Sequence, residues 1–152
     1  MKAKLIREET ALSISGMAVM AFGLWTIIRV VMEILINMSP AIEASKGSDE
    51  FIVYIILCVI MIFASLIALG FRAYIGLSAR SFGRGKDKGI LFIIVTGIVI
   101  VIDTAALVYS FFQSLDLAIS DIAAIFVDLT SLFALVRVMV AAISVRAYRA
   151  AK

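Results

Sequence analysis

The 152-residue sequence contains no histidine, one cysteine and one proline, and each scarcity removes a class of site. Without histidine the chain has no imidazole to ligate a b-type haem or most zinc sites. It also lacks the commonest general base near neutral pH. The single cysteine, Cys58, cannot form a disulfide within one chain. We therefore expect no cofactor and no disulfide framework.

Catalytic signatures are also missing from the sequence, which has no His-Asp-Ser set and no CxxC pair. The glycine-rich turn at residues 81–89 lacks the G-x-x-x-x-G-K-[ST] pattern of a phosphate loop. Asp103 and Asp128 could imitate an intramembrane aspartyl dyad, but neither belongs to a distinctive motif. The sequence thus predicts a protein that is not an enzyme.

Apolar residues make up 64% of the chain, and the mean hydropathy is +1.15. Soluble domains are about 45–50% apolar, so this composition is typical of membrane proteins. Four apolar stretches, at residues 11–38, 51–74, 89–112 and 117–145, are each long enough to cross a bilayer as a helix. We expect an all-α membrane protein, with residues 1–152 forming one antiparallel bundle of four transmembrane helices.

Lysine and arginine gather at one side of these four stretches, which predicts the orientation of the protein. That side carries Lys2, Lys4, Arg7, Arg72, Arg80, Arg84, Lys86, Lys88, Arg146, Arg149 and Lys152. The opposite side has only Lys46. Both termini are therefore expected in the cytoplasm, most economically in a bacterial inner membrane. The net charge of +3 suggests membrane lipids as partners rather than nucleic acid. We expect the basic residues near the inner surface to contact lipid head groups: Arg72, Arg80, Arg84, Lys86, Lys88, Arg146 and Arg149.

A short motif occurs twice, as Arg72-Ala-Tyr74 and Arg146-Ala-Tyr148, with an offset of 74 positions. The same offset aligns Gly23 with Gly97 and Arg29 with Asp103. This pattern suggests that residues 1–78 and 79–152 form two helical hairpins related by an axis along the membrane normal. The alternative is that Arg and Tyr are favoured independently near a membrane surface.

Four ionisable residues, Arg29, Glu33, Asp103 and Asp128, lie inside the apolar stretches. A lone charge at the centre of a bilayer costs about 2.5–3.5 kcal/mol on insertion scales, so pairing is expected. Arg29 can reach Glu33 one helical turn away, and Trp25 precedes Arg29 on the same stripe. If the repeat is real, Arg29 and Asp103 face the same axis and could also pair.

Three functions for this intramembrane cluster stay open from sequence alone. It could fix the register of the helices, bind a proton or cation, or receive a charge from another membrane protein. The leading hypothesis is a small non-enzymatic membrane protein that acts through assembly, as a homo-oligomer or as an accessory subunit of a membrane complex. The alternative is a small proton or cation channel or transporter that uses the acidic residues.

Overall fold

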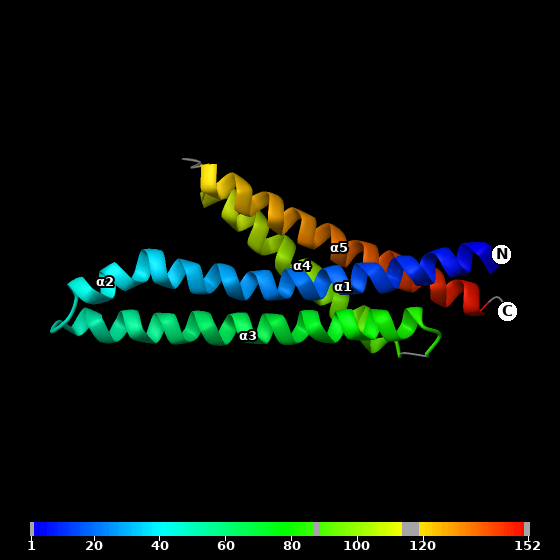
Figure 1. Cartoon of the computed structure of the whole chain (residues 1–152), viewed down its shortest axis with the longest axis horizontal. Helices are drawn as coiled ribbons and strands as arrows, with labels where there is room; N and C mark the ends of the chain where they lie inside the picture. The colour runs from blue at the N-terminus through cyan, green and yellow to red at the C-terminus, as the bar shows by residue number, and fades with distance from the viewer. Residues whose placement is uncertain (1, 87–88, 114–118, 151–152) are drawn as a thin grey trace.

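The computed structural model describes residues 2–86, 89–113 and 119–150, although the side chains of residues 2, 113 and 119–123 are excluded. The described residues are almost entirely helical and contain no strand (Figure 1). The helices are α1 (Lys2–Glu33), α2 (Ser39–Ala44), α3 (Asp49–Gly83), α4 (Leu91–Gln113) and α5 (Ile119–Ala150). The predicted all-α class is confirmed.

Four helical segments are long and apolar enough to cross a membrane: Ala3–Ala44, Asp49–Gly83, Leu91–Phe112 and Ala124–Ala150. They coincide with the four apolar stretches of the sequence. Three of the four segments extend beyond those stretches, because their ends carry charged residues and were therefore left out of the apolar stretches. A membrane-embedded protein therefore fits both the composition and the helix lengths.

The first segment changes its winding before it ends, through a π-helical turn at Ile34–Met38 that joins α1 to α2. The backbone N–H of Ser39 donates to the carbonyl of Ile34 across this turn. Pro40 follows in the first turn of α2. Proline has no N–H and its ring crowds the carbonyl four residues earlier, so a wider turn just before Pro40 relieves a clash that a regular helix would have.

Helices α1 and α3 form the first hairpin, and their backbones approach closely at glycines. A Cβ on Gly16 would lie 2.8 Å from the carbonyl oxygen of Gly76, and one on Gly76 would lie 2.5 Å from the carbonyl oxygen of Gly16. Gly83 is equally close to α1, with 2.6 Å from a Cβ to the carbonyl oxygen of Glu9. Small residues bring membrane helices into this kind of contact, where lipid supplies no hydrophobic force between them.

The second hairpin, α4 and α5, packs against the first, with α5 beside α1 and α4 beside α3. Chain direction alternates between neighbours, so each contact is antiparallel. Both termini lie at one end, called here the terminal end (Figure 1). The buried core belongs mainly to the half of the molecule near that end and includes Leu12, Val19, Ile75, Phe82, Phe92, Leu135, Val138 and Val145.

The two hairpins diverge toward the opposite end, where α2 and the start of α5 lie apart (Figure 1). The end of α1, the π-helical turn and the outer part of α4 accordingly expose large apolar side chains, such as Met32, Leu35, Val108 and Phe112. Hydropathy does not predict this divergence, because apolar residues that face lipid cannot be distinguished in a sequence from those that face another helix. It creates a crevice between the hairpins, and the charged residues lie along it.

Candidate functional site

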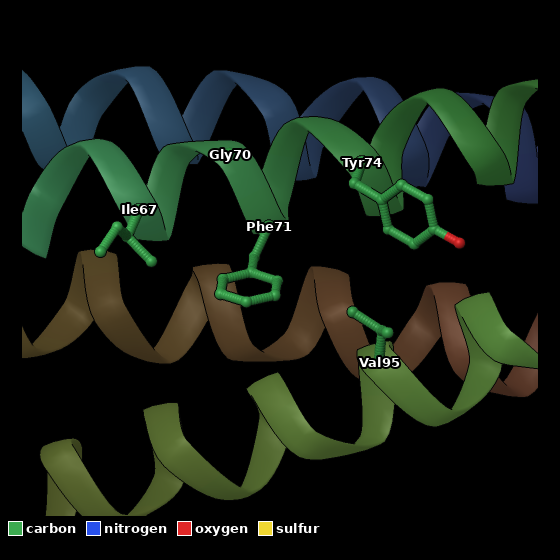
Figure 2. Close-up of a pocket in the computed structure, with 5 residues that line it drawn as sticks. All are labelled: Ile67, Gly70, Phe71, Tyr74 and Val95. Atoms are coloured by element: carbon green, nitrogen blue, oxygen red, sulfur yellow. The ribbon is translucent and has the colours of Figure 1, made fainter.

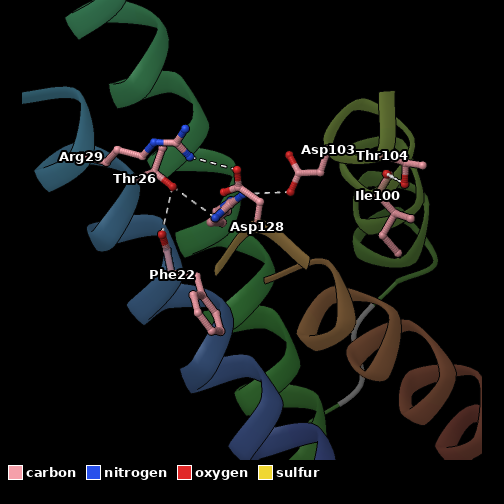
Figure 3. A network of polar contacts seen from close by, with 8 residues as sticks. Phe22, Thr26, Arg29, Ile100, Asp103, Thr104 and Asp128 are labelled. Atoms are coloured by element: carbon pink, nitrogen blue, oxygen red, sulfur yellow. Dashed lines mark hydrogen bonds and ion pairs between the residues drawn. The ribbon is translucent and has the colours of Figure 1, made fainter. Parts of the chain in front are cut away.

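Among the described residues, two of the ion pairs that join the two hairpins have both members within the apolar stretches (Figure 3). Arg29 on α1 donates from Nη1 to Oδ2 of Asp128 on α5, at 2.9 Å. Arg72 on α3 donates from Nη2 to Oδ2 of Asp103 on α4, at 2.8 Å. All four helices thus contribute one charge each, and the two pairs are together electrically neutral.

Thr26 connects this network to the backbone of α1 (Figure 3). Arg72 donates from Nη1 to the hydroxyl of Thr26 at 3.3 Å, while that hydroxyl donates to the carbonyl of Phe22 at 3.0 Å. One guanidinium therefore bridges three helices. A cavity of about 170 Å³ lies beside it, lined by Thr26, Arg72, Asp103, Ala106, Leu107, Ser110 and Asp128.

The two ion pairs differ in their exposure. The side chains of Arg72 and Asp103 are 12% and 24% exposed, while those of Arg29 and Asp128 are 45% and 43% exposed. The difference follows from the shape of the molecule, because Arg72 and Asp103 lie where the hairpins still touch and Arg29 and Asp128 lie where they separate. We name these contacts the inner pair and the crevice pair.

The predicted contacts of Arg29 were wrong. Its guanidinium pairs with Asp128 on the facing helix instead of Glu33, and Asp103 pairs with Arg72. The structure does bring Arg29, Asp103 and Asp128 into one region, but through partners that sequence spacing did not indicate. The missing participant was Arg72, which we had placed at the inner surface as a lipid contact.

The Arg72 side chain is 12% exposed and paired with Asp103, which leaves little of it for a lipid head group, and α3 continues for eleven residues beyond it to Gly83. At about 1.5 Å per residue, that places Arg72 roughly 16 Å from the end of the helix. The packing stripe of α3 gives the signal that sequence reading missed: Arg72 precedes the buried Ile75, Ala79 and Phe82 at helical spacing. Its counterpart in the repeated motif, Arg146, adjoins the buried Val145 but is itself exposed.

The acidic partners also lie on the packing stripes of their helices. Asp103 extends the buried stripe of Phe92, Thr96 and Val99 on α4. Asp128 precedes the buried Ser131 and Leu135 on α5. Charges therefore occupy the ends of stripes whose other members are packed against neighbouring helices, which is why each can meet an opposite charge across a helix interface.

Glu33 has a different environment from the other members of the cluster. It is exposed and has no ion pair or hydrogen bond with any described side chain. It lines a crevice of about 480 Å³ between α1 and the start of α5, together with Trp25, Ile28, Arg29, Met32, Ile36, Asn37 and Ala124.

Glu33 also lies further into the apolar zone than expected from the five residues that separate it from the end of the apolar stretch at residues 11–38. The sulfur atoms of Met38 and Cys58 are 3.4 Å apart, so Met38 is level with a residue seven positions into the uncharged part of α3. Glu33 precedes Met38 by five residues and therefore lies still further into that run. At about 1.5 Å per residue, the two steps place Glu33 roughly 18 Å from the start of that uncharged run, near its middle.

A second group of ion pairs joins α1 and α5 at the terminal end. Arg149 Nη2 lies 2.8 Å from Oε1 of Glu9 and also donates to the carbonyl of Phe82 at 2.8 Å. Its guanidinium carbon is 4.6 Å from the centre of the Phe82 ring. Arg137 lies 3.8 Å from Glu8. Arg149 is therefore held within the protein, contrary to its predicted contact with lipid.

The other predicted lipid contacts have mixed positions. Arg84, Lys86 and Arg146 are exposed near the terminal end, and Arg80 is half-buried. Lys88 lies outside the described residues. Their contact with lipid head groups stays a prediction. The internal repeat is also a prediction still; its matched glycines differ, since a Cβ on Gly23 would meet Leu69 and Arg72 at 3.1 Å and one on Gly97 would meet nothing within 4 Å.

An apolar groove runs between α3 and α4 on the side of the molecule (Figure 2). Its volume is about 420 Å³, and it is lined by Ile67, Gly70, Phe71, Tyr74 and Val95. No titratable group except the Tyr74 phenol lines it. The groove suits a lipid acyl chain better than a reaction. Within the part of the chain that the structure describes, no three His, Cys, Asp or Glu side chains are grouped to hold a metal ion.

No protein-family model, curated protein or solved structure matches this chain.

Proposed function

We propose that the chain is a non-enzymatic integral membrane protein that acts through assembly, either as a homo-oligomer or as an accessory subunit of a membrane complex. The observation that carries this proposal is the exposure of the crevice pair. Arg29 and Asp128 are nearly half exposed although both lie in helices that are apolar enough to cross a membrane. Lipid hydrocarbon is a poor neighbour for an ion pair, and a second protein surface can supply the missing cover.

The apolar sides of the crevice support the same proposal. The exposed residues on α1 beside the ion pair include Trp25, Ile28 and Met32, each between 46% and 49% exposed. Tryptophan, methionine and arginine are all enriched in protein interfaces, and tryptophan and arginine often dominate the binding energy. We also propose that both termini are cytoplasmic, because basic residues gather at the terminal end. We propose a bacterial inner membrane as the location.

Site-directed photocrosslinking in native membranes tests the assembly. In a Cys58→Ala background, Met32→Cys carries a benzophenone maleimide on the crevice side, and Val101→Cys, 68% exposed on α4, serves as the matched control. We expect protein adducts from position 32 and few from position 101. An adduct near twice 16.5 kDa identifies a second copy, and another mass identifies a different subunit. Monomer bands alone at position 32, or equal adducts at both positions, would overturn the proposal.

A second candidate, a channel or transporter for protons or cations, is favoured by one specific observation. Glu33 is an unpaired carboxylate near the middle of the apolar run, and it lines the crevice between α1 and the start of α5. Ion flux into liposomes, compared between the natural chain and the Glu33→Gln, Asp103→Asn and Asp128→Asn variants, decides this candidate. Absent flux, or flux that all three substitutions leave unchanged, rejects it.

A further inference from the structure

The crevice between α1 and α5 combines one acidic group with an apolar wall. Trp25, Arg29 and Glu33 follow one another at intervals of four residues and therefore form a polar and aromatic stripe along α1, and Asn37 of the π-helical turn lines the same crevice. Ile28, Met32 and Ile36 form the adjoining apolar strip. The volume of about 480 Å³ is within the usual range of roughly 300–1,000 Å³ for small-molecule sites.

The charges that line the crevice leave one negative charge without compensation. Arg29 is engaged by Asp128, and Arg72 is engaged by Asp103, so these four residues contribute no net charge. Glu33 has no basic partner among the described side chains. In an apolar zone an isolated carboxylate is costly, so a positive ligand gains more there than it would in water.

We propose that this crevice binds a monovalent organic cation with an apolar body. Glu33 neutralises the positive charge of the ligand, the face of the Trp25 indole contacts its cationic group, and Ile28, Met32 and Ile36 cover its apolar part. A single carboxylate cannot replace the six or more oxygen ligands of calcium, which argues against an inorganic divalent ion. The positive charge of Arg29 is already balanced by Asp128, so an anion would meet the uncompensated charge of Glu33.

This site goes beyond assembly, because all of its residues belong to one copy of the chain. Binding can therefore be present in a protein that does not crosslink to another, and absent in one that does. The binding site also differs from the channel or transporter candidate, since saturable binding can be measured without any ion flux. A partner that covers the crevice would compete with the ligand for Trp25, Ile28 and Met32. Binding is therefore measured on the purified chain and assembly in native membranes, so that failure of one proposal is distinguishable from failure of the other.

Trp25 is the only tryptophan in the sequence, so its fluorescence reports on the crevice alone. The probe is tetraphenylphosphonium, titrated into the purified full-length chain in mild detergent and in lipid nanodiscs. We expect saturable quenching in both. Tetraphenylborate, which has nearly the same shape and the opposite charge, is expected to show only weak, unsaturable partitioning.

Variants identify the group that holds the charge. Glu33→Gln is expected to weaken phosphonium binding at least tenfold, and Glu33→Asp is expected to retain most of it. Glu43→Gln is the matched control, because Glu43 is exposed on α2 and does not line the crevice. Far-ultraviolet circular dichroism and thermal unfolding show whether each variant is folded, and calorimetric titration repeats the measurement without the indole signal.

Three results would overturn the proposal. The first is quenching that rises in proportion to probe concentration without saturation. The second is equal saturable binding of the phosphonium and the borate. The third is an affinity that a folded Glu33→Gln variant keeps unchanged.

Discussion

Arg72 and Asp103 face each other between α3 and α4, with Nη2 of the arginine 2.8 Å from Oδ2 of the aspartate. The contact joins the two hairpins at the level where they begin to diverge, and Thr26 extends it to α1. Its two side chains are the least exposed of the ion-paired charges that lie within the apolar stretches of the sequence. Removing either one leaves the other charged and without its partner.

Loss of one member of the inner pair is therefore expected to destabilise the fold strongly. Breaking a buried ion pair by removing one partner typically costs about 3–5 kcal/mol. These side chains retain some exposure, so we expect the lower part of that range for Arg72→Met or Asp103→Leu. Thermal unfolding in mild detergent, followed by circular dichroism, measures the effect.

The double variant Arg72→Met/Asp103→Leu separates a structural role from a functional one. Replacing both members of a buried pair by apolar residues is often close to neutral for stability. We expect the double variant to be more stable than either single variant. If it is as unstable as the sum of the two, the two side chains do not act as a pair and the contact is not the source of the stability.

The crevice pair is expected to contribute less when the protein is alone. Exposed ion pairs are worth about 0–1 kcal/mol, since solvent screens them. Asp128→Asn should thus lower stability by about 1 kcal/mol or less in detergent, well below the effect at Asp103. The same substitution measured in native membranes should cost more if a partner covers the crevice. Equal effects of Asp103→Asn and Asp128→Asn in detergent would contradict the difference in exposure.

The sequence predicted the parts of the fold that hydropathy determines. Four apolar stretches predicted four long helices, and helix length follows from the need to satisfy every backbone hydrogen bond in lipid. Charged members of the candidate site were also identified, since an ionisable residue inside an apolar stretch stands out. Arg72 shows the limit of that approach: it stands at the edge of an uncharged run, so hydropathy assigned it to the surface.

The partners of the charges could not be predicted because they depend on how the hairpins pack. Arg29 and Asp103 occupy matched positions of the possible repeat, yet they do not pair with each other. Arg29 pairs with Asp128 on α5, and Asp103 pairs with Arg72 on α3. Glu8 and Glu9 were overlooked for the opposite reason. They precede the first apolar stretch and resembled residues of a solvated tail, while the structure directs them toward Arg137 and Arg149 on α5.

The orientation of the chain can be tested by reporter fusion. A fluorescent protein that matures only in the cytoplasm, attached after Lys152, is expected to fluoresce, and an alkaline phosphatase at the same place to be inactive. Cysteine labelling gives an independent measurement in a Cys58→Ala background. Arg84→Cys should react with an impermeant maleimide only in inverted vesicles, and Lys46→Cys only in intact cells. The reverse labelling pattern would contradict the orientation inferred from lysine and arginine.

The close contact between α1 and α3 predicts that alanine has different effects at glycines in this contact and at helical glycines with open space beside them. A Cβ on Gly16 would lie 2.8 Å from a backbone oxygen of α3, so Gly16→Ala must push the two helices apart. Gly70 and Gly97 are also helical, but a Cβ on either would meet nothing within 4 Å. Alanine is more favourable than glycine within a helix by about 0.5–1 kcal/mol.

We expect Gly16→Ala to lower the unfolding temperature and Gly70→Ala and Gly97→Ala to raise it slightly or leave it unchanged. Thermal unfolding of the three variants in one detergent makes the comparison, and a loss of stability at Gly97 equal to that at Gly16 would show that helix contact is not what Gly16 provides.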